Sequence, residues 1–115
     1  MFGTNYHIMH KNTPVADVFL SSDHKYIKID KLVPDGPFQP FGGNKLDLER
    51  FYRFIKGRCY EDCRADLPEI LASVGLESND PYKWIRISHG VTWEDFFWVK
   101  FDDENIKWED VKIRD

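Results

Sequence analysis

The segment Tyr26–Leu32, YIKIDKL, decides the fold class because its apolar and charged residues alternate. Ile27 and Ile29 fall on one face of an extended chain, whereas Lys28 and Asp30 fall on the other. A period of two is typical of a β-strand with one buried and one solvated face. The sequence therefore predicts a sheet whose apolar face must be covered by other elements.

Two segments before this strand complete a predicted antiparallel meander. Residues 14–20, PVADVFL, are rich in the β-branched and aromatic residues that favour strands, and residues 5–10, NYHIMH, form a shorter run. Lys11-Asn12 and the segment SSDHK, residues 21–25, separate the three runs. We expect Asn12 to make the first connection tight, because asparagine tolerates the left-handed backbone conformation.

Two amphipathic helices are predicted after a loop rich in proline and glycine, residues 34–44. Apolar residues recur at i, i+3, i+4 and i+7 in the first helix, at Leu48, Phe51, Tyr52 and Ile55. The second helix repeats this spacing at Leu67, Ile70, Leu71 and Val74. Asp66 and Glu69 fit a capping box at its start, and Gly75 fits its end. We expect the apolar stripes of both helices to pack on the sheet.

The remainder of the chain predicts a short helix, a strand and a closing segment. DPYKWIRISHG, residues 80–90, favours a third helix because aspartate, proline and glycine stand where a helix begins and ends. In GVTWEDFFWVKFDDENIKWEDV, residues 90–111, Thr92 and Asp95 fit a capping box, which predicts a helical turn. Within the same stretch FFWVKF, residues 96–101, predicts a strand that joins the meander.

The tryptophans divide between the core and a contact surface. A domain of this size needs large aromatic residues in its core, where each contributes about 1.5–3 kcal/mol on burial. Trp98 lies within the predicted strand, so we expect it in the core. Trp93 stands in the predicted cap turn beside Glu94, where contact with a partner is equally well supported.

The composition bounds the class of protein. The chain has 115 residues, of which 42% are hydrophobic and 16% aromatic, so we expect one α+β domain over residues 1–115. A net charge of -4 argues against a nucleic-acid binder, because attraction to phosphates needs a basic surface. No apolar run is long enough to span a bilayer, and no secretory signal pattern is present. We expect Cys59 and Cys63 as reduced thiols in a soluble, cytoplasmic protein without membrane contact.

No arrangement of residues predicts catalysis, a metal site or a cofactor. His7 and His10 would point to opposite sides of a strand, and zinc needs three or four ligands at characteristic spacings. Ser88 and His89 are neighbours in sequence rather than parts of a shaped triad. We therefore expect no enzyme activity, no metal and no cofactor.

Three segments, in this order, resemble the N-terminal, non-kinase portion of HipA-like serine/threonine kinases from Gram-positive bacteria. They are IMHKNTPVADVFL, residues 8–20, FIKGRCYEDCRADLPEILASVGL, residues 54–76, and ISHGVTWEDFFWVKFDDENIKWEDV, residues 87–111. The matching motifs are an Arg-x5-Arg spacing at Arg58 and Arg64, a strand at Phe97-Trp98-Val99, and a Trp-Glu-Asp-hydrophobic segment at Trp108 to Val111. The resemblance covers most of the chain except residues 34–44.

This resemblance implies a free-standing regulatory module, similar to the small separate partner in some split HipA-type toxin–antitoxin systems. The kinase residues of the family follow this region and have no counterparts here, so no catalytic residue is carried over. Arg58, Arg64 and Trp93 are the predicted partner-binding residues, because arginine and tryptophan often anchor interfaces. For both arginines a local ion pair is the alternative.

The leading hypothesis is thus an antitoxin-like, non-catalytic module of bacteria or phage that docks on a protein partner. The partners that this hypothesis names are a HipA-like kinase or a toxin encoded nearby.

The second hypothesis is an acidic inhibitor, carried by a mobile element, that covers the nucleic-acid channel of a defence enzyme. Its mark would be carboxylates aligned on one face. In this sequence carboxylates are spread over several segments and interleaved with lysines.

Overall fold

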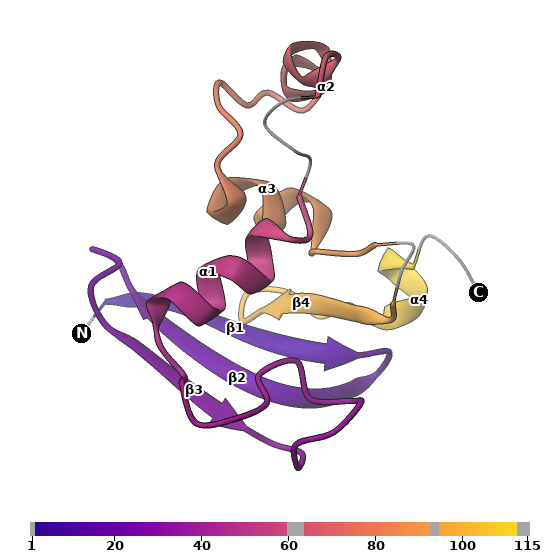
Figure 1. Cartoon of the computed structure of the whole chain (residues 1–115). Coiled ribbons are helices and arrows are strands. Elements are labelled where there is room, and N and C mark those ends of the chain that lie inside the picture. The colour runs from indigo at the N-terminus through magenta and orange to yellow at the C-terminus, as the bar shows by residue number, and fades with distance from the viewer. Residues whose placement is uncertain (1, 60–63, 93–94, 113–115) are drawn as a thin grey trace.

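The N-terminal third forms three antiparallel strands, as its alternation predicts: β1 (Gly3–His10), β2 (Thr13–Ser21) and β3 (Ile27–Lys31). Strand β4 (Phe97–Phe101) pairs with the other side of β1, so the strand order is β3-β2-β1-β4 (Figure 1). All neighbours are antiparallel. The predicted sheet, a meander joined by a C-terminal strand, is confirmed.

The computed structural model describes residues 2–59, 64–92 and 95–112, and four short helices lie within them. They are α1 (Leu48–Lys56), α2 (Leu67–Ser73), α3 (Pro81–Ser88) and α4 (Trp108–Val111). The N-caps Asp47 of α1 and Asp80 of α3 each accept a hydrogen bond from a backbone N–H of the first turn. No helix in the described ranges combines the length and apolarity needed to cross a membrane. The α+β class predicted from the sequence is confirmed.

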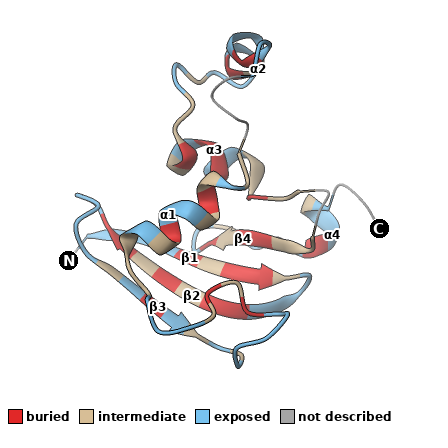
Figure 2. Cartoon of the chain, viewed as in Figure 1, coloured by how far each residue is buried: buried red, intermediate tan, exposed pale blue. Residues whose placement is uncertain are grey.

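The apolar face of the sheet, here called the covered face, packs against α1 and α3 (Figures 1 and 2). All four strands contribute to it, through Tyr6, Ile8, Val18, Leu20, Ile29, Val99 and Phe101. Phe51 and Ile55 of α1 and Ile85 of α3 complete this core, and all three are fully buried. Covering these apolar side chains is the main favourable contribution to the fold.

Helix α2 does not pack on the sheet, which corrects the expectation for the second amphipathic helix. Figure 1 shows α2 standing away from the sheet, on the far side of α3. Leu67 and Leu71 of α2 are buried, yet they belong to neither cluster of core residues. The predicted capping box is also wrong, because the Asp66 side chain caps no backbone N–H and instead accepts a hydrogen bond from Arg64. An apolar stripe indicates that a helix is covered, but not which surface covers it.

The opposite face of the sheet, here called the open face, carries polar side chains from all four strands: Asn5, His7, Asp17, Lys28, Asp30 and Lys100. A second, smaller cluster covers one end of it, where Trp108 of α4 packs with Met9 and Trp98. Trp98 is fully buried, as predicted. Its indole N–H donates to the carbonyl of Lys11 at 2.6 Å, so its polar atom is also satisfied.

Two local turns differ from expectation. In the β1–β2 turn Lys11, and not Asn12, has a positive φ, of 53°. The Asn12 side chain is used elsewhere, because its oxygen accepts a hydrogen bond from the first backbone N–H of α4 at 2.9 Å. Asp95 lies outside any helix and accepts a bond from the backbone N–H of Phe97 at 3.0 Å. The rest of that predicted helical turn, residues 93–94, lies outside the described residues.

Candidate functional site

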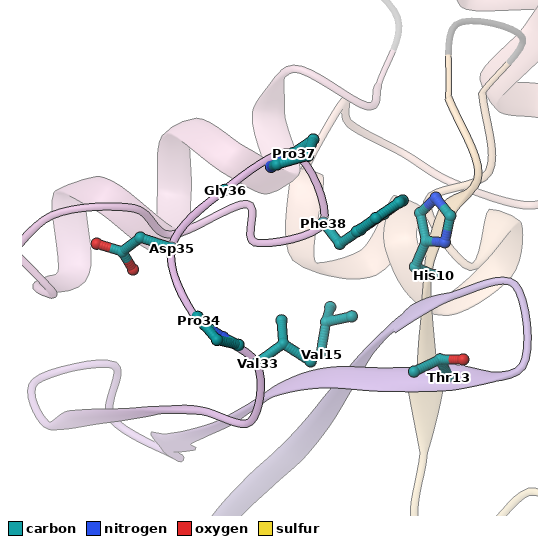
Figure 3. A pocket seen from close by; sticks show the side chains of 9 residues that line it. All are labelled: His10, Thr13, Val15, Val33, Pro34, Asp35, Gly36, Pro37 and Phe38. Carbon is teal, nitrogen blue, oxygen red and sulfur yellow. The ribbon is translucent and has the colours of Figure 1, made fainter.

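A cavity of about 590 Å³ opens between the proline-rich loop and the β1–β2 hairpin (Figure 3). Its lining comes from the ends of β1 and β2 and from the start of the loop: His10, Thr13, Val15, Val33, Pro34, Asp35, Gly36, Pro37 and Phe38. This volume lies in the range of cavities that hold small ligands. Carbon atoms make up most of the lining, so the cavity is suited to an apolar or aromatic group.

A buried glutamine holds the loop that forms one wall of this pocket. The Gln39 amide donates to the carbonyl oxygens of Val15 and Val33 at 3.0 and 2.9 Å. Its oxygen accepts a bond from the backbone N–H of Phe41 at 3.2 Å. Because both ends of the buried amide have partners, Gln39 connects the loop to the sheet without the penalty of an unpaired polar group. The fully buried ring of Phe41 then fixes the loop in the core.

A second tether holds the same loop from outside the pocket. The Lys31 ammonium donates to Asp35 at 2.7 Å and to the carbonyl of Gly43 at 2.6 Å, and the Gly43 N–H donates to Asp35 at 3.0 Å. These bonds lower the pKa of Asp35, so its carboxylate is charged and engaged at neutral pH. Figure 3 shows the Asp35 side chain pointing away from His10 and Phe38. The carboxylate therefore belongs to the loop's support rather than to the pocket interior.

Aromatic rings form the rim of the pocket at its other end. The His10 ring lies edge-on to Phe38, with 4.8 Å between centroids, and to Phe97, with 5.2 Å between centroids. Phe38 remains 56% exposed, which is unusual for so large an apolar side chain. An aromatic or aliphatic group entering the pocket would cover the exposed part of Phe38.

Arg58, one of the predicted partner-binding residues, is engaged inside the protein. Only 8% of its side chain is exposed. The guanidinium forms a bidentate ion pair with the Asp95 carboxylate. It also donates to the carbonyl of Phe97 at 2.9 Å and, through Nε, to the carbonyl of Gly90 at 2.5 Å. These bonds connect the end of α1 to the start of β4. Partner binding by Arg58 stays a prediction, and the contacts give this residue a structural role as well.

Arg64 lies in a different environment, at the surface before α2. Its side chain is 48% exposed, and Nε donates to Asp66 at 2.5 Å, so the local ion pair considered as an alternative is present. Exposed pairs of this kind contribute little stability, and a partner's carboxylate could replace Asp66 at small cost. Trp93, the third predicted residue, lies outside the described residues. Arg58 is thus almost fully buried, whereas Arg64 lies at the surface.

A histidine between two carboxylates lies on the open face. His7 Nδ1 is 2.9 Å from Asp17, Nε2 bonds to Asp102, and Asn5 donates to Asp102 at 2.7 Å. Partial burial disfavours the imidazolium, but the bonds to Asp102 and Asp17 outweigh it and raise the pKa of His7. The same contact with His7 lowers the pKa of Asp102. His10 points to the covered face, so the prediction that the two histidines face opposite sides is confirmed.

The hydroxyl of Ser88, the imidazole of His89 and the thiol of Cys59 each form a hydrogen bond within the protein. The Ser88 hydroxyl accepts a bond from a backbone N–H, and His89 pairs with Glu104 at 2.7 Å while ending α3 with a φ of 57°. The Cys59 thiol donates to the carbonyl of Ile55 at 3.2 Å, and burial raises its pKa to about 11. Across the described ranges, no group of three or more histidine, cysteine, aspartate or glutamate side chains is arranged to hold a metal ion.

Ion pairs involve carboxylates on several parts of the surface. Those with a lysine, arginine or histidine within 4.0 Å include Asp17, Asp35, Asp66, Asp95, Asp102, Asp103 and Glu104. A surface that imitates a nucleic-acid backbone needs a field of one sign, because it must attract a basic channel. Pairing with cations weakens that field.

The pocket was not predicted from the sequence. Residues 34–44 form a connection without regular structure, as predicted, but Gln39 and Phe41 of this loop are buried. The available signal was the presence of large residues, Phe38 among them, between prolines and glycines, where a flexible linker would carry small polar residues.

Comparisons of this chain with models of protein families, with curated proteins and with solved structures found no match.

Proposed function

We propose that this chain is a non-catalytic protein-binding module that holds an apolar or aromatic side chain of its partner in the pocket beside Phe38. The carrying observation is the apolar cavity itself, whose loop wall is fixed by Gln39. A site formed in advance lowers the entropic cost of binding. Phe38 stands at the rim, where the large exposed aromatic residues of interfaces often contribute most to affinity.

The polar groups of the pocket support binding rather than catalysis. A catalytic pair needs a nucleophile or acid within hydrogen-bond reach of a positioned base. Asp35 is directed away and bound to Lys31, and the His10 ring is set against the rings of Phe38 and Phe97. These contacts orient the imidazole as part of an aromatic rim.

The partner class that we propose is a HipA-like kinase or related toxin, in an antitoxin-like relation. Support comes from the resemblance of residues 8–20, 54–76 and 87–111, which include parts of the sheet and of each helix. The pocket loop, residues 34–44, lies outside the resembling segments. A shared framework with a distinct loop is consistent with a module that has its own partner specificity. The reduced state expected for the cysteines supports a cytoplasmic location.

The alternative, an acidic inhibitor of a nucleic-acid-binding defence enzyme, receives less support from the surface. Its carboxylates would have to attract a basic channel, and many of them are paired with cations of this chain. The two hypotheses differ in their response to salt. Raised salt screens an acidic contact strongly, whereas it affects the seating of an apolar side chain much less.

Binding to defined partners tests the proposal. The tagged chain is co-expressed with the products of neighbouring genes and with any HipA-like kinase of the same genome, and affinities of co-purified pairs are measured by calorimetry. Phe38→Ala should weaken binding by about 30-fold or more, because an interface anchor contributes about 2 kcal/mol or more. Phe2→Ala is the matched control, since Phe2 is 90% exposed and does not line the pocket.

Arg64→Ala and Trp93→Ala, in the same assay, test the residues predicted from the sequence. Binding that is equally strong in Phe38→Ala and Phe2→Ala would overturn the pocket as the site. The absence of binding to any of these proteins would overturn the proposed partner class.

A further inference from the structure

The two edge strands of the sheet use their outward backbone groups differently. At β4 the outward groups have partners from three other segments: the side chain of Arg58, the carbonyl of His89 and the side chain of Glu104. The bond from the Val99 N–H to the His89 carbonyl, for example, is 2.7 Å long. An additional strand at β4 would have to displace these partners.

The edge of β3 has no such cover. The Tyr26 carbonyl and the Leu32 N–H bond to β2, so even-numbered residues of this strand direct their backbone groups toward β2. Ile27, Ile29 and Lys31 therefore direct theirs outward, on the outermost strand of the sheet (Figure 1). In the part of the chain that the structure describes, nothing bonds to these outward groups. An unpaired edge is a template for another strand.

We propose that a second copy of this chain pairs with this edge, with the two β3 strands antiparallel about a two-fold axis at Ile29. In this register Ile29 faces Ile29 of the second copy, and Ile27 faces Lys31. Each of these residues has outward N–H and C=O groups, so facing residues can exchange hydrogen bonds. The contact uses the same surface on both molecules, as a two-fold dimer requires.

The side chains on the open face are complementary in this register. Lys28 faces Asp30 of the second copy, and Asp30 faces its Lys28, so two pairs of opposite charges lie across the junction. Tyr26 faces Leu32 at both ends of the paired segment. These two residues are 48% and 49% exposed in the single chain, and pairing gives each an apolar neighbour.

Neighbouring registers lack this complementarity. A two-fold axis at Lys28 sets two lysines directly opposite one another, and an axis at Asp30 sets two aspartates opposite one another. Like charges in facing positions destabilise paired strands. The alternation of charge along β3 therefore makes this strand complementary to a second copy of itself when Ile29 is the centre. The pairing does not use the pocket beside Phe38 and is independent of the proposed function.

Charge reversal tests the pairing. We expect the purified chain to show a concentration-dependent monomer–dimer equilibrium in sedimentation velocity. Lys28→Asp and Asp30→Lys should each weaken the dimer by about tenfold or more, because each turns two attractive pairs into repulsive ones. The double variant should restore the dimer, since it exchanges the charges and keeps them opposite. Lys83→Asp, the same change at an exposed site on α3, should leave the equilibrium as it is.

Hydrogen exchange then locates the contact. The amides of Ile27, Ile29 and Lys31 should become protected as the concentration rises, while circular dichroism confirms that all variants are folded. A monomer at every concentration would overturn the proposal and leave this edge to a strand of another protein. A double variant that remains as weak as the single ones, or protection elsewhere in the chain, would overturn it equally.

Discussion

Replacing Arg58 with alanine should destabilise the fold strongly, although the sequence offered partner binding or a local ion pair as the roles of this residue. The substitution removes donors from the carbonyl oxygens of Gly90 and Phe97 and from the Asp95 carboxylate. Breaking a buried ion pair costs about 3–5 kcal/mol. The lower value applies here, because Asp95 is 36% exposed and water can replace part of the lost contact. We therefore expect the free energy of unfolding to fall by about 3 kcal/mol.

Arg64→Ala is the matched control within the same chain. Its ion pair with Asp66 is exposed on both sides, with 48% and 55% of the two side chains accessible. The expected loss of stability is small, because an exposed ion pair contributes little to the free energy of unfolding. Arg58→Lys should fall between the two alanine variants, because lysine keeps the charge but cannot form the planar fork.

Urea denaturation followed by circular dichroism measures these differences. The free energy of unfolding of a small domain falls by about 1–3 kcal/mol per molar urea, so Arg58→Ala should lower the midpoint by about 1–3 M. Arg64→Ala should shift it by less than about 1 M. Equal midpoints for the two alanine variants would refute the reasoning, because they would show that the Arg58 contacts do not hold the end of α1 to β4.

Three other side chains give measurable outcomes. Because its pKa is raised in the fold, His7 stabilises the fold fully below its unfolded pKa of 6.5, and this contribution is lost as pH rises through the folded value. His7→Gln should therefore lower the free energy of unfolding by about 0.5–1 kcal/mol near pH 6 and by little at higher pH, as measured by thermal denaturation. An equal loss at both pH values would contradict this. Gln39→Ala leaves two carbonyl oxygens without their donor, so the free energy of unfolding measured in urea should fall by about 2 kcal/mol. A loss near zero would show that water replaces the amide. In a variant with Cys63 changed to serine, Cys59 of the folded chain should react with iodoacetamide at pH 8 about 100-fold more slowly than in the unfolded chain. The reason is that burial raises the pKa of Cys59 to about 11 in the folded chain. Equal rates in the two states would show an accessible thiolate.

Strands and helices of this protein were predictable because their signals are local. The alternation in residues 26–32 and the i, i+3, i+4 spacing from Leu48 to Ile55 each lie within one element. The position of α2 was not predictable in this way. Its stripe at Leu67 and Leu71 has the same spacing as that of α1, and only the path of the chain through space decides that α3 covers the sheet instead.

The same limit applies to the candidate site. Arg58 and Arg64 are alike in residue type and in their acidic surroundings in the sequence, yet one is buried and the other is exposed. The difference comes from Asp95, which is 37 residues away from Arg58. The pocket likewise depends on a contact between Gln39 and Val15, 24 residues apart, that no periodicity indicates. Such pairings become visible only when the fold is known.

The covered edge of β4 limits what strand pairing can build. A sheet with two available edges can add a molecule at each side, and the result is an open-ended filament. In this chain Arg58, His89 and Glu104 occupy the groups that an incoming strand would need at β4. A contact through β3 then consumes the accessible edge of both molecules and offers no site for a third. Variants that remove all three of these contacts from β4 would supply that missing growth point and turn a self-limiting sheet into one prone to fibre formation.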